Sequence, residues 1–523
     1  MRLLTKNSFF IFFFLYTLAF GLMLFNRGVF WDDWVLYNID KEVIRNICGQ
    51  IGTPWIGYLF TNFYSLFNKT IFFHRILVFL AYFFPLLFLN SILKNIKQID
   101  NSSRFFIVLF FALFPLNNAR IALATFLYTL CYFTFFLAFW LLSRYLSKKQ
   151  ILLRIISLIF FFFSFSTNSF LVFYSLPLLY ILYSEAKNIT CLKNFFKIIL
   201  KYFDFIILPL AFWLIKNTYF KPYGLYDNYN QITFNFLKKI PVGLVKTFYF
   251  SFLAIIDNSF QFFFSNPFLA LIISILIFQI LKSKQAGKFA DKNINIKILF
   301  TGIFAFIVGT IPYLAVGKTP NNYDWSSRYQ LLLPLGAGLI LFAIIYLILN
   351  ELKSGSAVKI FIFSFFVVLF LNQNIQNCLS WQIDWYKQIS LTENFKESKI
   401  MTNNTTFLFK DNTVDLNANG RLYRRYEYAG LMKYAFGEEK RFGCRIEKFD
   451  GIIDIDNNQN NKTYYNLKDY KPIEPQYKVF IDYGLIKINN INVVKFMIWE
   501  IFEPKKFNDV IKNIVKLNFV KIS

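Results

Sequence analysis

Long apolar runs recur along the first 375 residues of the chain and restrict its fold more than any other feature. A run of roughly 18 apolar residues is long enough to cross the hydrocarbon core of a bilayer as a helix. The chain has 523 residues, of which 56% are hydrophobic, and a soluble domain would not carry such an apolar load. We therefore predict an α-helical polytopic membrane protein with about 11 transmembrane helices. The predicted spans are 8–26, 76–93, 105–117, 121–143, 155–166, 169–184, 203–219, 267–281, 298–316, 329–349 and 358–375.

Basic residues gather in the short loops between these spans and predict the orientation of the chain. The formal net charge of +26 would suggest a nucleic-acid partner in a soluble protein. Here the positive-inside rule is the simpler explanation, so we expect no nucleic acid to bind and predict a cytoplasmic N-terminus. Residues 1–26 resemble an uncleaved signal anchor, because no small-residue cleavage site follows their apolar run. The basic loops predicted to lie inside are 94–104, 144–154, 187–201, 282–297 and 353–359.

One apolar segment conflicts with a simple count of spans. Residues 243–264 are apolar enough to cross the membrane, but a span there would place the basic loop 282–297 outside. Asp257 and Gln261 also interrupt the run. We therefore predict that 234–264 forms an interfacial or re-entrant helix on the outer side, where other parts of the protein shelter its polar backbone.

The character of the sequence changes near residue 380, where apolar runs shorten and Asn, Asp, Glu and Lys become frequent. We predict a transmembrane domain with catalytic outer loops over 1–379, and a small soluble α/β domain on the extracytoplasmic side over 380–523. An amphipathic helix is expected over 424–436, ended by Gly437. Strands are expected over 405–411, 478–483 and 491–501.

Cysteine and histidine are too few and too scattered to predict a zinc site. The chain has 5 Cys and 1 His, and no two of the cysteines form a CxxC pair. Cys378 and Cys444 both fall in the predicted oxidising compartment, so a disulfide between them is expected, with Cys48 as a competing partner.

Two adjacent acids in the first predicted outer loop are the best candidates for catalysis. The sequence FWDDW places Asp32 and Asp33 between Trp31 and Trp34, a few residues beyond the first span. Tryptophan favours the membrane interface, where the low dielectric raises the pKa of at least one carboxyl of a repelling pair. Such a pair suits a general base or a ligand set for a divalent cation, Mg or Mn. The alternative is a loop that simply begins with acidic residues.

This arrangement resembles the GT-C superfamily of membrane glycosyltransferases. The resemblance rests on FWDDW in the first outer loop, on the many spans and on the soluble extracytoplasmic C-terminal domain. It implies a polyprenyl-phosphate-linked sugar as donor, and an acidic motif, here Asp32 and Asp33, that deprotonates the acceptor or helps to hold a metal. A second acidic motif in a later outer loop is not clear in this chain. Asp227 is the nearest stand-in, which leaves metal dependence open.

Basic residues next to the predicted outer ends of spans are candidates for binding the donor phosphate. Phosphate of a lipid-linked donor lies at this depth, and the planar guanidinium of Arg binds phosphate with two parallel hydrogen bonds. The alternative is an interfacial anchor that extends to water. Asp324 lies four residues before Arg328, so an i,i+4 ion pair would also explain both residues. The candidates are Arg120, Lys221, Lys318 and Arg328.

Aromatic residues near the predicted outer face are candidates for stacking on sugar or acceptor rings. The ordinary aromatic belt of a membrane protein is the alternative. In the C-terminal domain, Arg421, Arg424 and Arg425 with Glu427 are interpreted as a solvated or domain-facing helix surface, with acceptor binding as the alternative. The aromatic candidates are Trp31, Trp34, Trp55, Tyr58, Tyr226 and Trp325.

The sequence therefore predicts a glycosyltransferase of the hexosyltransferase type in the bacterial inner membrane. It would move a sugar from a polyprenyl-phosphate-linked donor to a glycan or lipid acceptor on the outer face. One alternative is a polysaccharide polymerase or ligase that depends on outer-loop arginines. A transporter or flippase fits less well, because transporters place ionisable groups at mid-membrane and these spans are nearly free of charge. A non-catalytic scaffold is a further alternative.

Overall fold

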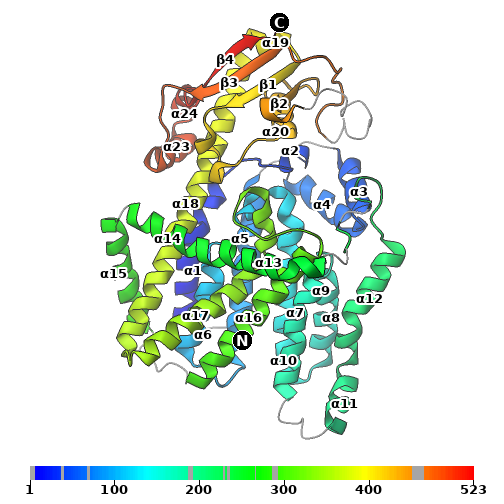
Figure 1. Ribbon diagram of the computed structural model, residues 1–523, viewed down its shortest axis with the longest axis vertical. Coiled ribbons are helices and arrows are strands. Elements are labelled where there is room, and N and C mark those ends of the chain that lie inside the picture. The colour runs from blue at the N-terminus through cyan, green and yellow to red at the C-terminus, as the bar shows by residue number, and fades with distance from the viewer. Residues whose placement is uncertain are drawn as a thin grey trace.

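A bundle of long helices carries a small mixed sheet at one end in the computed structural model of the chain (Figure 1). The structure describes residues 6–36, 40–67, 71–185, 192–227, 230–232, 236–265, 267–284, 292–449 and 465–522. The predicted inside loops 187–201 and 282–297 lie partly outside these residues.

Seven helices within the described residues are long and apolar enough to cross a membrane, and they indicate a multi-pass membrane protein. The pair Asn194–Lys201 and Phe203–Tyr219, bent by 54°, would be an eighth span. The predicted total of about 11 is not reached, because several other apolar helices are shorter than the roughly 20 residues that a straight span needs. The seven are Ser8–Phe25, Ile71–Lys94, Leu123–Lys148, Lys238–Gln261, Lys292–Ala315, Leu333–Glu351 and Ser356–Glu397.

The boundaries of the bundle helices are set by local signals as well as by apolarity. Helix α6 begins four residues before the predicted span at 105, because the Asp100 carboxylate accepts the N–H groups of Ser102 and Ser103 at 2.7 and 2.9 Å. The bundle helices are α1 (Lys6–Phe20), α5 (Ile71–Lys94), α6 (Asn101–Leu113), α7 (Phe126–Lys148), α8 (Ile151–Ser164), α9 (Ser169–Phe173), α10 (Ser175–Glu185), α11 (Leu192–Lys201), α12 (Phe203–Tyr219), α13 (Phe236–Phe248), α14 (Ala254–Ser265), α15 (Pro267–Lys284), α16 (Lys292–Ala315), α17 (Leu333–Glu351) and α18 (Ser356–Glu397).

Glycine allows α16 and α17 to pack closely within the bundle. A Cβ on Gly336 would lie 2.5 Å from the backbone nitrogen of Phe306, and one on Gly302 would lie 2.9 Å from that of Ile340. Small residues at a crossing of membrane helices bring the two backbones together, and dispersion contacts then hold them. This close pair lies beside the loop that follows α16, which contributes residues to the candidate site.

The segment predicted as interfacial or re-entrant forms α13 and α14, which run across the upright helices of the bundle in Figure 1. A π-helical turn, Tyr249–Leu253, joins the two. Its Ser251 hydroxyl accepts a hydrogen bond from Gln330 Nε2 at 2.8 Å, so this polar side chain finds a partner within the protein. The transverse course favours the interfacial interpretation, although Lys238–Gln261 is long enough to span.

The predicted outer loops fold into short helices at the end of the bundle that carries the sheet (Figure 1). The first loop contributes three α-helices, and the later loops contribute short 3₁₀ turns. These elements are α2 (Asp33–Leu36), α3 (Lys41–Gln50), α4 (Pro54–Phe67), η2 (Asn118–Ile121), η3 (Leu123–Thr125), η5 (Gly224–Tyr226) and η7 (Asp324–Gln330).

Helix α18 joins the bundle to the sheet without a break. Apolarity predicts a span over 358–375, but the helix continues through the expected domain boundary at residue 380 to Glu397. Its 42 residues make it roughly 63 Å long. About half of that length exceeds the hydrocarbon core of a bilayer, which is roughly 30 Å thick. The C-terminal domain is therefore attached through a continuous helix, and no loop intervenes.

The C-terminal domain contains a four-stranded sheet in the order β2-β1-β3-β4, in which β1 pairs in parallel with β2 and β3, and β4 is antiparallel to β3. Two predicted strands are confirmed as β1 and β3, and the predicted helix is confirmed as α20, ended by Gly437 at φ 74°. The strand predicted over 491–501 is wrong, because this segment is helix α23. The elements are α19 (Lys399–Asn403), β1 (Thr406–Asp411), η8 (Val414–Leu416), η9 (Ala418–Gly420), α20 (Arg425–Phe436), β2 (Phe442–Arg445), η10 (Ile446–Lys448), β3 (Tyr477–Tyr483), α23 (Asn490–Phe502), α24 (Pro504–Ile511) and β4 (Val515–Lys521).

The predicted disulfide between Cys378 and Cys444 does not form. The Cys378 thiol, on α18, donates to the backbone oxygen of Ala19 at 3.7 Å, where α18 packs against α1. The Cys444 thiol, on β2, donates to the backbone oxygen of Lys448 at 3.4 Å. The two cysteines lie on different elements with different neighbours, which sequence spacing does not reveal.

A buried network of charged residues fastens the C-terminal domain to α18. Asp384 accepts hydrogen bonds from Arg421 Nε at 2.6 Å and from the Tyr423 hydroxyl at 2.8 Å. Arg421 Nη1 also donates to Glu427 Oε2 at 2.5 Å. Burial alone would lower the pKa of Arg421, but Asp384 and Glu427 outweigh it and hold that pKa above its ordinary value. Arg421 is therefore a buried permanent cation between two carboxylates, so that of the predicted solvated or domain-facing surface the solvated alternative is excluded for it.

A second buried ion pair lies about one turn further along α18. Lys387 Nζ donates to Asp411 Oδ2 at 2.6 Å and to the backbone oxygen of Thr413 at 2.9 Å. Burial raises the pKa of Asp411, but Lys387 and Thr413 outweigh it and hold the pKa below its ordinary value. The two ion pairs fix the end of β1 and the start of α20 on the same helix.

The Arg421→Leu variant should lose about 3–5 kcal/mol of unfolding free energy, because it leaves two buried carboxylates without their cation. Thermal unfolding of the full-length protein in detergent measures the loss. Arg425→Leu is the matched control, since Arg425 is exposed on the same segment and its loss should cost less than about 0.5 kcal/mol. Equal unfolding temperatures for the two variants would contradict the role given to the network.

Candidate functional site

The FWDDW segment is held between the bundle and the C-terminal domain. The backbone N–H of Trp31 donates to Glu427 Oε2 at 3.2 Å, and its indole N–H donates to Asp324. Trp31 is buried and adopts φ 50°, a left-handed conformation that is costly for a bulky residue. Contacts from two distant segments therefore hold this residue in a strained conformation, as is common at functional sites.

Aromatic packing closes around both tryptophans of the segment. The Trp31 ring lies 4.9 Å from Trp325 and 4.8 Å from Trp381, measured between ring centroids. Trp34 packs on α20, where a Cβ on Gly430 would lie 2.8 Å from its ring, and its backbone oxygen accepts from Asn466 Nδ2 at 2.7 Å. Both rings are at most 2% exposed, which favours packing over the predicted stacking on a sugar or acceptor.

Asp33 faces inward and holds the loop that follows α6. Its carboxylate accepts the backbone N–H groups of Leu123 at 2.8 Å, Ala124 at 2.7 Å and Phe30 at 3.3 Å. The side chain is fully buried, and burial raises the pKa of Asp33 to about 7 against the opposing effect of these N–H groups and Arg75. Asp33, predicted as catalytic, therefore has the geometry of an anchor between η3 and FWDDW.

Asp32 faces the other way and remains half-exposed. It forms a hydrogen bond with the Tyr426 hydroxyl and lies close enough to Arg424 to act on it electrostatically. Arg424 Nη2 lies 3.5 Å from Asp324 Oδ2, so one cation serves two carboxylates. We call Asp32, Asp324, Arg424 and Tyr426 the Asp32 cluster. It joins three segments: FWDDW, η7 and the start of α20.

Arg328 lies in η7, next to the Asp32 cluster in the chain. Its guanidinium is 4.3 Å from the Trp325 ring centroid and 4.4 Å from that of Tyr329, and its Nη1 donates to the backbone oxygen of Trp325 at 2.8 Å. Trp325 itself is buried between Arg328 and Trp31. The i,i+4 ion pair with Asp324 is replaced by these contacts, because Asp324 faces Arg424.

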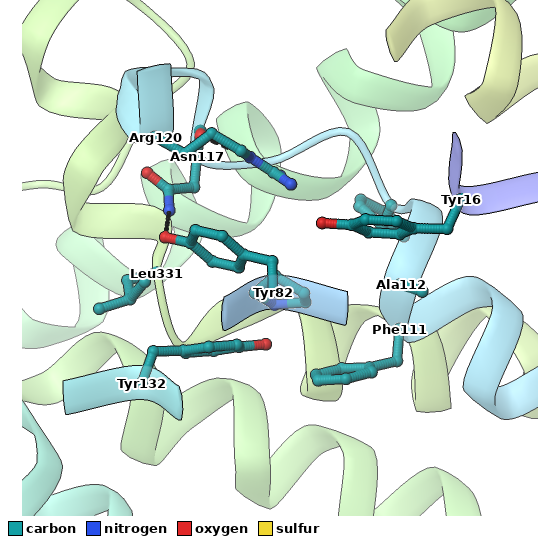
Figure 2. Close-up of a pocket in the computed structure, with 10 residues that line it drawn as sticks. Tyr16, Tyr82, Phe111, Ala112, Asn117, Arg120, Tyr132 and Leu331 are labelled. Carbon is teal, nitrogen blue, oxygen red and sulfur yellow. Dashed lines mark hydrogen bonds between the residues drawn. The ribbon is translucent and has the colours of Figure 1, made fainter. Parts of the chain in front are cut away.

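Arg120, predicted to bind the donor phosphate, points into the bundle. Its Nε and Nη2 donate to the backbone oxygens of Asn117 and Leu116 at 3.2 and 2.5 Å. Figure 2 shows its guanidinium beside Tyr82 and Tyr16 at a buried cavity. The cavity has a volume of about 20 Å³, which suits about one water molecule and no phosphate group. In this conformation Arg120 is placed to hold the turn at residues 117–120.

The other predicted ligands gather around α4 and the chain near residue 220. The Trp55 indole N–H donates to Ser166 Oγ at 3.2 Å, and its ring lies 4.8 Å from that of Phe220. Tyr58 is exposed beneath Arg45, and Tyr226 is half-buried in η5. Lys221 is exposed, while Lys318 donates to Asn230 and lies 5.4 Å from the Tyr329 ring. These partners differ from those of Asp32.

The predicted divalent-cation site does not fit the acidic pair. Both Asp33 oxygens accept backbone N–H groups, so Asp32 and Asp33 do not offer a shared set of carboxylate oxygens. Among the residues that the structure describes, no three His, Cys, Asp or Glu side chains form a group that could hold a metal ion. The acidic pair is therefore assigned no metal-dependent step.

Sequence reasoning identifies Asp32 but misses the residues that surround it. It treats Asp324 only as a partner of Arg328. It treats Arg424 as part of a helix surface, with acceptor binding as the alternative. Tyr426 is not singled out. The run RRYEY at 424–428 places basic and aromatic residues at the start of a predicted helix, a pattern that could have indicated a binding site. Its proximity to FWDDW is a tertiary contact between segments almost 400 residues apart.

Comparison with known proteins adds no function for these residues. Comparison of the chain with protein-family models, with curated proteins and with solved structures found no match. The resemblance to the GT-C superfamily therefore rests on FWDDW and on the arrangement of apolar helices, and function must be inferred from the geometry of the described residues.

Asp33 should make the stability of the fold fall as the pH rises. Its pKa is about 7 in the folded chain, against roughly 3.9 in an unfolded one. Between these values the folded state holds a proton that the unfolded state has released, so the free energy of unfolding decreases with rising pH. Asp33→Asn has no such proton, and its unfolding temperature should fall less than that of the wild type between about pH 5 and about pH 8.

The control for losing one carboxyl is Asp227→Asn, because Asp227 is exposed in the loop after α12. A pH dependence in Asp33→Asn as steep as that of the wild type would contradict the buried, protonatable state of Asp33.

Proposed function

We propose that the chain is a membrane glycosyltransferase of the GT-C type, with Asp32 as its general base. The observation that carries the proposal is the Asp32 cluster, in which a half-exposed carboxylate lies beside Tyr426 and Arg424, between the helical bundle and the C-terminal domain. Such a position gives a polar acceptor access from the domain side and a lipid-linked donor access from the bundle side.

The reaction is a displacement at the anomeric carbon of the donor sugar. An acceptor hydroxyl attacks this carbon while Asp32 removes its proton, and a new glycosidic bond forms. The bond between the anomeric carbon and the phosphate oxygen breaks, and polyprenyl phosphate leaves with the electron pair. Arg424 and Arg328 supply positive charge near the departing phosphate, and Tyr426 orients the Asp32 carboxylate through its hydroxyl.

A polysaccharide polymerase or ligase is the second candidate. The observation in its favour is Arg328, which two aromatic rings and a backbone carbonyl hold in one orientation. A preorganised guanidinium of this kind suits a phosphate-linked donor in either enzyme class. The two candidates differ in whether the carboxyl of Asp32 is needed.

The proposed location is the bacterial inner membrane, with the C-terminal domain on the extracytoplasmic side. The arrangement of basic residues supports this proposal. Lys149, which follows α7, and Lys201, the last residue of α11, approach the buried carboxylate of Glu185 at the end of α10 at 3.8 and 2.8 Å. Figure 1 has α10 and α11 at the end of the bundle opposite the sheet. Basic turns at one end fit a cytoplasmic face there.

The Asp32→Asn variant should lose at least about a hundredfold of transfer activity, since a positioned general base contributes about 10²–10⁴-fold. Asn keeps the size of Asp but cannot accept the proton. Membranes containing the wild type or a variant are incubated with a panel of polyprenyl-phosphate sugars, and mass spectrometry measures the glycan and lipid products. Unfolding temperature and expression level should match the wild type.

Glu474→Gln is the matched control, because Glu474 is an exposed acid of the C-terminal domain. It should keep wild-type activity. If Asp32→Asn also keeps full activity while Arg328→Gln loses it, the arginine-dependent polymerase or ligase replaces the proposed enzyme.

The side of the membrane can be tested with reporters fused after Ser523, which leave α18 and the sheet intact. A reporter that is active only outside the cytoplasm should give signal, and one that is active only in the cytoplasm should stay silent. Strong cytoplasmic signal would place FWDDW on the inner side and contradict the proposed use of an outer-face donor.

A further inference from the structure

Helix α23 of the C-terminal domain is apolar on two faces. Val493, Phe496 and Met497 face inward and are at most 8% exposed. The Tyr386 ring of α18 lies 6.2 Å from Phe496, and the Tyr386 hydroxyl donates to Glu500 at 2.8 Å. One face of the helix is therefore packed against α18, as a helix in a globular domain requires.

The opposite face of α23 is a continuous apolar surface that the described residues leave open. Val494, Ile498, Ile501 and Phe502 follow the i, i+4, i+7, i+8 pattern of a single helix face, with 40%, 52%, 52% and 76% of their surfaces exposed. A soluble domain gains nothing from such a face in water, because each exposed apolar side chain forgoes the free energy of burial. We call these four residues the α23 face.

The position of α23 along α18 shows where the helix lies relative to the predicted membrane-spanning part of α18. At the start of the helix, the Asn490 side chain donates to Gln376, the residue next to the end of the apolar run 358–375. Helix α23 thus begins where the apolar part of α18 ends. Figure 1 shows it beside α18, between the sheet and the helices α14 and α15. A bilayer centred on the apolar run 358–375 would have its headgroup zone at this level.

Lysine residues border the α23 face. Lys495 Nζ lies 4.6 Å and Lys506 Nζ 4.4 Å from the Trp499 ring centroid. Lys487 and Lys505 lie on either side of the helix in the chain, and both are exposed. An apolar helix face with Trp and a basic border is the composition of helices that lie in the interface of an anionic bilayer. The position of α23 along α18 and the lysines that border it therefore both indicate that a lipid bilayer covers the α23 face.

We propose that the α23 face inserts into the headgroup region of an anionic lipid bilayer and so fixes the C-terminal domain on the membrane surface. The apolar side chains enter the boundary between headgroups and acyl chains, and Lys487, Lys495 and Lys505 bind lipid phosphate, while Lys506 is paired with Glu503 at 2.9 Å. This docking surface does not depend on the proposed glycosyltransferase activity, because it involves none of the residues of the Asp32 cluster.

A fluorescent amino acid placed at position 498 of the full-length protein tests the proposal. The protein is reconstituted in nanodiscs of phosphatidylcholine and phosphatidylglycerol that carry a doxyl quencher near the headgroup. Position 520 is the matched control, since Val520 on β4 is 51% exposed against 52% for Ile498. Quenching at 498 should exceed that at 520 by at least about twofold, because an interfacial helix face lies roughly 5–10 Å deep.

One double variant and one change of lipid composition examine the source of the effect. Ile501→Gln with Phe502→Gln should reduce quenching at 498 while leaving the unfolding temperature unchanged, because both side chains are exposed. Nanodiscs of phosphatidylcholine alone should also reduce it, since the lysines then lose their anionic partner.

Three results would overturn the proposal. Equal quenching at 498 and 520 by aqueous iodide, with none by doxyl lipid, would mean that the face lies in water. Protection of 498 from both quenchers would mean that a protein surface covers it, and loss of that protection on dilution into empty nanodiscs would identify a second copy of the chain. Equal doxyl quenching with and without phosphatidylglycerol would remove the anionic lipid from the proposal.

Discussion

The rest of the site depends on one buried interaction, in which Arg421 lies between Asp384 of α18 and Glu427 of α20. Glu427 also accepts the backbone N–H of Trp31, so the same carboxylate that neutralises the arginine holds FWDDW in its left-handed turn. A buried cation without partners would be prohibitive, and a strained tryptophan without a partner would relax. Glu427 therefore stabilises both the buried charge of Arg421 and the left-handed conformation of Trp31.

Adjacent residues of one motif take opposite roles here. The φ of 50° at Trp31 precedes a short helix that turns Asp33 toward the backbone of η3 and leaves Asp32 toward the domain. Sequence alone treats the two acids as a pair, because they share charge, neighbours and distance from the first span. Their environments differ in burial and in hydrogen-bond partners, because Asp33 is fully buried against backbone N–H groups and Asp32 is half-exposed beside Tyr426 and Arg424.

Apolar patterning predicts long apolar helices such as α5 and α17, because a span must be apolar along its length, but it does not predict the number of spans. It predicts the C-terminal domain less well. Residues 491–501 are rich in Ile, Val, Phe and Trp, which favour strands, yet tertiary contact with Tyr386 makes them a helix. The edge strand β2 has only 4 residues, and the prediction from sequence misses the alternating Val515, Leu517 and Phe519 of the edge strand β4. The surroundings of Asp32 come from segments distant in the chain, and a single sequence carries no record of such contacts.

Helix α18 connects the bundle to the C-terminal domain, and it can also transmit motion between them. A continuous helix of 42 residues passes the motion of one end to the other, apart from the gentle curvature that long helices adopt. A tilt of about 5° at its base would carry its far end sideways by about 5 Å, given a length of roughly 63 Å. That displacement exceeds the reach of a hydrogen bond such as the one between Glu427 and Trp31. The helix is thus a lever, and any molecule that wedges between it and the bundle would act on FWDDW from a distance.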